Sequence, residues 1–213
     1  MRTVLHDDRI ATTVALRGLG LSEGVLREAA MQGYLARTNC TANHPPMYPS
    51  FVAWGEAVRA LREQLLPLGW TRRDENNYPR TVHPGGRIAI AIAAGNEATG
   101  MPNESPTTSS AKGPSTVAAV ELNRLQYCLP FLEPELRTAD DDESQLTTWL
   151  LLIHHAAEEI RSELSLPFEI GADGRINGWR ERIILLSLPL DPEPLVVTPP
   201  PQPSFDIAIR RKV

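Results

Sequence analysis

The residues best suited to chemistry in this sequence flank a long polar loop between a strand and a helix. Asn96 and Glu97 follow an alternating apolar run, and Lys112, Ser115 and Thr116 stand at the start of the next helical pattern. An ammonium group, two hydroxyls and the free N–H groups of a helix start are donors suited to an anion. We therefore predict that these five residues bind a small polar or phosphate-bearing ligand.

The same loop contains part of a phosphate-binding motif. Residues 95–100, GNEATG, match the first six positions of a Walker A loop, but Met101 and Pro102 stand where the motif needs Lys and Ser or Thr. Without that lysine the loop lacks the charge that holds the terminal phosphate, so the sequence does not predict a P-loop. A capped helix that simply follows a polar loop is the alternative interpretation of residues 112–116.

Other catalytic and metal-binding patterns are missing from the sequence. It has no GxSxG nucleophile motif and no HExxH or paired Cys/His spacing, and Cys40 and Cys128 stand far apart. The adjacent His154 and His155 would point to opposite faces of a strand, so they cannot easily bind one metal ion. The acidic run 140–143 lacks the alternation and the glycine of a calcium loop. We predict no catalytic residue, no metal and no cofactor.

Charge and composition limit the partners. The net charge is −5, with ten Arg against eight acids in residues 1–85 and eleven Lys or Arg against eighteen acids in residues 86–213. Neither part has the strongly basic balance typical of a nucleic-acid-binding protein. No apolar run is long enough for a membrane span, and the N-terminus lacks a signal-peptide core, so we expect a cytoplasmic protein without membrane contact. Nineteen of the 21 basic residues are Arg, a bias that we expect in a GC-rich bacterial or phage gene.

Hydrophobic periodicity predicts three helices. Two are expected near the N-terminus, at 22–37 and 50–66, and a central helix at 114–128 begins with proline, which suits the first helical position. In the helix at 50–66, Ser50 is the expected N-cap. The residues expected to face inward are Val52, Trp54, Val58, Leu61, Leu65 and Leu66.

Alternating patterns predict the strands and, with the helices, an α+β fold. Strands are expected at 69–72, 78–83, 87–94, 146–154 and 159–170, and again after an Asp173-Gly174 hairpin turn. The helices would cover one face of a mainly antiparallel sheet with about five to seven strands.

The C-terminal part of the sequence predicts the domain organisation. Residues 1–188 are expected to form a single α+β domain, and 189–203 contain seven prolines, which is typical of an extended linker. The final segment, 204–213, alternates again, so we expect it to dock as an edge strand on this domain or on a partner.

These observations favour a non-enzymatic bacterial or phage accessory protein that binds a protein partner or a small anionic ligand. If the 204–213 segment docks on another copy, it would make a homodimer. One alternative is an enzyme acting on a nucleotide or another phosphoester, centred on Glu97, Lys112, Ser115 and Thr116. A second alternative is a nucleic-acid-associated accessory factor that uses the Arg residues of 59–73 and 175–182.

Overall fold

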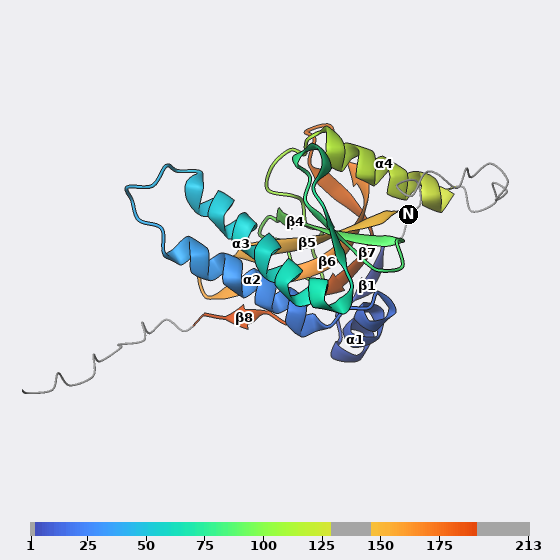
Figure 1. Ribbon diagram of the computed structural model, residues 1–213, viewed down its shortest axis with the longest axis horizontal. Coiled ribbons are helices and arrows are strands. Elements are labelled where there is room, and N and C mark those ends of the chain that lie inside the picture. Colours follow the sequence, from blue (N-terminus) through green and yellow to red (C-terminus); the bar gives the residue numbers. More distant parts are fainter. Residues whose placement is uncertain (1–2, 129–145, 191–213) are drawn as a thin grey trace, which may run out of the picture.

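The computed structural model of the protein describes residues 3–128 and 146–190 (Figure 1). The elements follow one another as β1 (Val4–His6), α1 (Arg9–Gly18), α2 (Glu23–Thr38), α3 (Tyr48–Leu65), the short 3-10 helix η1 (Leu66–Leu68), β2 (Thr71–Arg73), the 3-10 helix η2 (Glu75–Asn77), β3 (Arg80–Val82), β4 (Ile88–Ala94), α4 (Pro114–Cys128), β5 (Thr147–His155), β6 (Glu159–Ile170), β7 (Ile176–Ile184) and β8 (Leu188–Pro189).

The strands form one mixed sheet in the order β1-β7-β6-β5-β4-β3-β2, and β8 pairs with the start of β6. The pairs β1–β7 and β4–β5 are parallel, and the other pairs are antiparallel. Because a parallel pair needs a crossover connection, the chain leaves β4 through a long loop and α4 before it enters β5. This crossover carries the predicted site residues.

Helices cover both faces of the sheet (Figure 1). Side chains of α1, α2 and α3 pack with Trp149, Leu151 and Ile153 of β5 in the larger core cluster. The side chains between them, Leu150 and Leu152, point the other way and pack in a cluster with Val120 of α4. Alternate residues of one strand therefore enter two separate cores, as the period of two requires.

The predicted α+β fold is confirmed, with three differences in detail. The sheet has eight strands, because the two-residue β8 adds to the seven of the main path. A third N-terminal helix, α1, precedes the two predicted ones, with Asp8 as its N-cap. The prediction that all helices cover one face was wrong, because α4 packs on the face opposite α2 and α3.

The predicted inner face of the long helix α3 was right only in part: Leu61 and Leu65 are buried as predicted. The helix begins at Tyr48, so Ser50 lies inside its first turn rather than at the cap. Its buried positions are Ala53, Ala57, Ala60, Leu61 and Leu65, whereas the larger Val52, Trp54 and Val58 are only partly buried. Small residues are buried because α2 lies too close to leave room for larger ones.

The closest approach of the two helices is at Gly33 of α2. A Cβ atom added at this position would lie 2.6 Å from the Ala53 carbonyl oxygen and 3.2 Å from the Ala57 Cβ. Since the obstructing atom is backbone, a side chain here would force the helices apart.

The domain boundaries predicted at the C-terminal end fall largely on residues that the structure does not describe. β8 and Leu190 still belong to the paired structure, because the Leu190 N–H donates to the Glu158 carbonyl at 2.7 Å. The rest of the predicted linker, the 204–213 segment and the acidic run 140–143 lie outside the described residues. None of the described helices is both long enough and apolar enough to cross a membrane.

We predict opposite effects for two glycine substitutions in this helix pair. Gly33→Ala should lower the free energy of unfolding by about 1–3 kcal/mol because it overpacks the contact. Gly55→Ala in α3 meets no atom within 4 Å, and should raise the free energy of unfolding by up to about 1 kcal/mol through helix propensity. Urea titration of both variants measures this difference, and equal effects would show that the helices are not in tight contact.

Candidate functional site

The loop between β4 and α4, residues 95–113, lies against the sheet as a strap. Backbone N–H groups of Asn96 and Ser109 donate to Thr107 and Ala94 carbonyls, each at 2.9 Å, and the Thr108 N–H donates to the Ile176 carbonyl at 3.1 Å. The Trp179 indole of β7 donates to the Pro106 carbonyl at 2.7 Å. The strap is thus bound to both β4 and β7.

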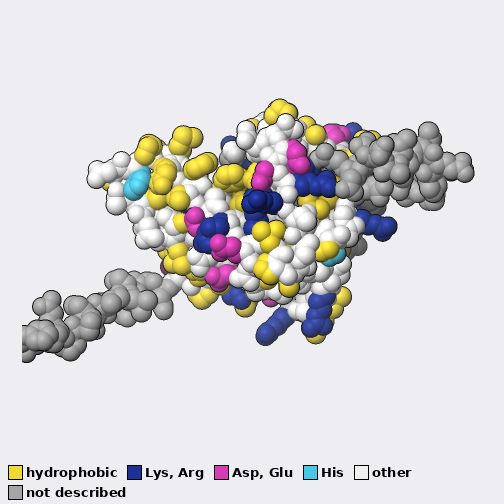
Figure 2. All heavy atoms as spheres, viewed as in Figure 1, with side chains coloured by type: hydrophobic (Ala, Val, Ile, Leu, Met, Phe, Trp, Pro, Cys, Tyr) yellow, Lys and Arg dark blue, Asp and Glu magenta, His cyan; other side chains and the backbone are white. Residues whose placement is uncertain are grey.

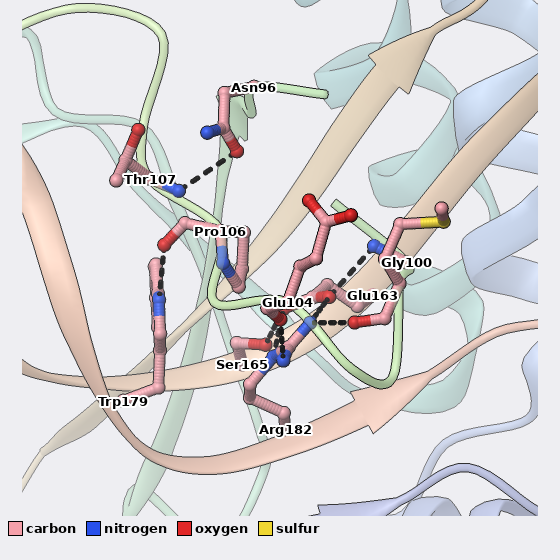
Figure 3. Close-up of polar contacts among 10 residues, drawn as sticks. Asn96, Gly100, Glu104, Pro106, Thr107, Glu163, Ser165, Trp179 and Arg182 are labelled. Carbon is pink, nitrogen blue, oxygen red and sulfur yellow. Dashed lines mark hydrogen bonds and ion pairs between the residues drawn. The ribbon is translucent and has the colours of Figure 1, made fainter. Parts of the chain in front are cut away.

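A buried ion pair holds the middle of the strap (Figure 3). Glu163 of β6 is 0% exposed and Arg182 of β7 is 5% exposed. The two groups form a bidentate pair, with Nε and Nη2 of Arg182 at 3.0 and 2.6 Å from the carboxylate oxygens. The carboxylate also accepts from the Gly100 N–H at 2.9 Å and from the Ser165 hydroxyl at 2.6 Å. Both charges are therefore compensated without water.

The remaining donors of Arg182 bind the strap backbone. Its Nη1 donates to the Glu104 carbonyl at 2.6 Å and its Nη2 to the Met101 carbonyl at 3.1 Å. Gly100, between these contacts and the sheet, has a φ of +74°, and a Cβ there would lie 3.1 Å from the Arg161 Cβ. Glycine is needed at this position because of both the positive φ and the close approach.

Two of the five predicted ligand-binding residues meet at one cavity, and three do not. Lys112 and Thr116 line a cavity of about 150 Å³, which we call the Lys112 cavity. Asn96 is used within the strap, where its Oδ1 accepts from the Thr107 N–H at 3.0 Å. Glu97 is exposed and Ser115 is partly buried, and neither lines this cavity. The structure therefore brings Lys112 and Thr116 together at this cavity and leaves Asn96, Glu97 and Ser115 outside its lining.

The opposite wall of the Lys112 cavity is formed where the paired strands β3 and β4 separate, a place that we call the fork. These strands pair through Thr81↔Ile90 and Val82↔Ala89, and the same register would place Pro79 opposite Ile92. Proline has no N–H to continue the ladder, so the strands separate there. The Trp54 indole of α3 donates to the Ile92 carbonyl instead, at 3.2 Å. Trp54, Pro79 and Ile92 all line the cavity.

The electrostatics of this cavity favour a negatively charged occupant. Burial lowers the pKa of Lys112, and among the described residues no carboxylate forms an ion pair with it. The helix α4 starts at Pro114, directly after Gly113, which has no side chain to accept from the first-turn N–H groups. A cation and the positive end of a helix therefore lie at one side of the cavity.

Tyr78 also lines this cavity. Its hydroxyl is buried beside Thr116 but makes no hydrogen bond of good geometry with the described residues. Burial raises the pKa of Tyr78 to about 12, although Arg80 and Thr116 favour the ionised form. The group is thus a neutral donor at physiological pH. A buried polar group without a partner destabilises the folded chain unless water or a ligand satisfies it.

The sequence analysis missed Tyr78 and Trp54 as site residues. The pairing of β3 with β4 and the packing of α3 on the sheet bring them to the cavity. The pattern Tyr78-Pro79, a proline inside an apparent strand, was the available signal, because proline interrupts a ladder and leaves space beside it.

A second, smaller hollow lies beside the first, sharing Trp54, Ile92 and Ala93 with it. It is lined by His155, whose Nε2 is buried without a hydrogen-bond partner. Burial lowers the pKa of His155 to about 4, with further contributions from Arg37 and His154. The ring of His155 lies edge-on to Tyr34 of α2, with centroids 5.8 Å apart.

In the hairpin 175–182, considered above for nucleic-acid binding, Trp179 and Arg182 are both buried. Trp179 is 5% exposed and bound to the strap, so its ring has no free face on which a base could stack. Arg182 is neutralised by Glu163. Within the described residues there is also no group of three or more His, Cys, Asp or Glu side chains placed to hold a metal ion.

Comparisons of the chain with protein-family models, with curated proteins and with solved structures found no match. Its function is therefore inferred from the geometry of its own residues.

We predict that Glu163→Gln is strongly destabilising. The substitution keeps the shape of the side chain but leaves the buried Arg182 without a counter-charge, so the free energy of unfolding should fall by about 3–5 kcal/mol. The control is Glu121→Gln on α4, which breaks an exposed pair with Arg124 at 3.3 Å and should change stability by no more than about 0.5 kcal/mol. Denaturant titration distinguishes them, and a loss below about 1 kcal/mol for Glu163→Gln would contradict the role of the pair.

We also predict that His155 makes stability depend on pH. The ordinary histidine pKa is 6.5 and the folded value is about 4, so between these values the unfolded chain binds a proton that the folded chain resists. Stability should therefore fall as the pH is lowered from about 6.5 to about 4. His155→Phe, which keeps a ring against Tyr34, should reduce this slope in denaturant titrations across the range. An unchanged slope would show that His155 is not the group responsible.

Proposed function

We propose that this protein is a non-enzymatic binding protein that takes up a small oxyanion, of the size of phosphate, in the Lys112 cavity. The observation that supports this most directly is the half-buried ammonium of Lys112, which forms no ion pair with a carboxylate of the described residues. It lines the same cavity as Tyr78 and Thr116, two residues that carry hydroxyl groups.

The size of the cavity restricts the ligand. A volume of about 150 Å³ corresponds to about five water molecules at roughly 30 Å³ each. Sites for larger ligands and cofactors usually exceed about 300 Å³. A small oxyanion with one or two waters fits, whereas a whole nucleotide does not unless part of it remains outside.

The donor set suits a tetrahedral oxyanion. The Lys112 ammonium supplies a point charge, and Tyr78 and Thr116 supply hydroxyl donors. The start of α4 adds the partial positive charge of the helix dipole. The Arg80 guanidinium lies over the Tyr78 ring, 5.5 Å from its centroid, and pairs with Glu75 at 3.3 Å.

The enzymatic alternative loses its acid–base group in this arrangement. It depended on Glu97 acting together with Lys112, but Glu97 is exposed and outside the cavity. Among the described residues, no carboxylate, histidine or cysteine lines the Lys112 cavity. General acid–base chemistry on a bound phosphoester would need such a group within hydrogen-bond reach. Binding without turnover is therefore the better supported proposal.

We predict that inorganic phosphate stabilises the wild-type protein against heat. At one hundred times its dissociation constant, a ligand that binds only the folded state adds about 2.7 kcal/mol. Lys112→Met should abolish the shift and Tyr78→Phe should weaken it. Arg175→Met should leave it unchanged, because it removes a positive charge from an exposed side chain near the cavity but outside it. Differential scanning fluorimetry and isothermal titration calorimetry measure these effects.

Two outcomes would contradict the proposal. One is the absence of any shift with phosphate, sulfate or acetate. The other is an equal loss in Lys112→Met and Arg175→Met, which would indicate general screening of positive charge. Because the bound form requires the charged ammonium, affinity should also fall once the pH exceeds the lowered pKa of Lys112.

A further inference from the structure

The hairpin of α2 and α3 carries a groove and an exposed apolar end, neither of which belongs to the Lys112 cavity. The groove, which we call the hairpin groove, has a volume of about 410 Å³, and its apolar lining includes Leu35, Tyr48 and Val52. At the end of the hairpin, Met47 and Phe51 are 78% and 63% exposed. Figure 2 shows hydrophobic side chains gathered over this end of the molecule. Clusters of exposed apolar side chains usually mark an interaction site.

Acidic side chains continue the hairpin groove along the helices. Glu56 lines the groove, and a neighbouring hollow that shares Gln32 with it is lined by Glu28 and Glu63. Glu56 and Glu63 both pair with Arg59. Two carboxylates thus share one guanidinium, and Glu28 lines the same hollow, so this part of the surface has an excess of negative charge.

The described chain ends next to the helix that forms one side of this groove. The Leu190 N–H donates to Glu158, in the turn between β5 and β6. His155, at the same turn, packs edge-on against Tyr34, which is the residue before Leu35. The following residues therefore start their path beside the C-terminal half of α2.

We propose that residues 204–213 of the same chain dock in the hairpin groove. Their sequence, SFDIAIRRKV, places Phe205, Ile207 and Ile209 at alternate positions and three basic residues after them. In an extended segment the three apolar side chains share one face, which suits the Leu35, Tyr48 and Val52 lining. The basic residues 210–212 then meet the excess of carboxylates further along the hairpin.

The length of the intervening chain agrees with docking on the same molecule. Thirteen residues, 191–203, separate Leu190 from the segment, and six of them are proline. At roughly 3.1 Å per residue in a polyproline conformation they can span roughly 40 Å. The sixteen residues of α2 span about 24 Å at 1.5 Å per residue. The connection can thus reach past the end of the hairpin and turn back along the groove.

This location differs from the edge-strand docking expected from the sequence. The strands at the two ends of the described sheet, β1 and β2, have only three residues each. Such short edges offer few ladder hydrogen bonds to a segment of ten residues. The hairpin groove instead offers an apolar surface and opposite charge.

Disulfide trapping with the native Cys40 tests the proposal. Cys40 is a free thiol that lines the hairpin groove. In the full-length chain with Cys128→Ser, Phe205→Cys should form an intramolecular disulfide with Cys40 under mild oxidation. The matched control, Asp206→Cys, points to the opposite face of an extended segment and should react at least about tenfold more slowly. Peptide mapping of the non-reduced monomer measures both rates.

The charged end of the segment gives a second measurement. Arg210→Glu combined with Arg211→Glu should slow the trapping of Phe205→Cys severalfold, and so should high salt, because the pairing is exposed. Equal rates for positions 205 and 206 would overturn the proposal. Disulfides found only between molecules would also overturn it, and would assign the groove to a second copy.

Discussion

The buried pair of Glu163 and Arg182 is the interaction on which the strap and its surroundings depend. It joins β6 to β7, and it forms further hydrogen bonds with three backbone groups of the strap. An apolar pair of similar volume could fill the same space, but it would leave those backbone groups without partners. The charges are therefore best understood as specifying the path of the strap rather than as adding stability for its own sake.

The path of the strap in turn determines where α4 begins. The Lys112 N–H donates to the Gly174 carbonyl at 2.9 Å, which attaches the end of the strap to the turn before β7. This contact brings the first turn of α4, with Thr116, to the fork that Pro79 opens between β3 and β4. The candidate anion site thus lies between the start of α4 and the fork at Pro79, which are far apart in the sequence.

Elements with strong periodicity could be predicted from the sequence, but their neighbours and parts of their inner faces could not. The helix α1 was not predicted because Thr12 and Leu16 are its only buried residues, so its sequence shows no apolar stripe. The coverage of both faces of the sheet was indicated by the nearly continuous apolar runs of β4 and β5, which are typical of strands buried on both sides. Lys112 and Thr116 could be found from local helix-start chemistry. That Asn96 bonds within the strap, to Thr107, could not be predicted, because the fold of a long loop leaves no periodic pattern in the sequence.

The strap also has a consequence for the order in which the chain folds. Its contacts join residues that are 63 and 81 positions apart, from Gly100 to Glu163 and from Met101 to Arg182. Until β6 and β7 have paired, the two charges are not together, and the strap has nothing to bind. Closing such a long loop before that moment would lose chain entropy without a compensating contact. The strap is therefore among the last parts to become ordered, and its contacts act mainly by slowing the unfolding of the finished molecule.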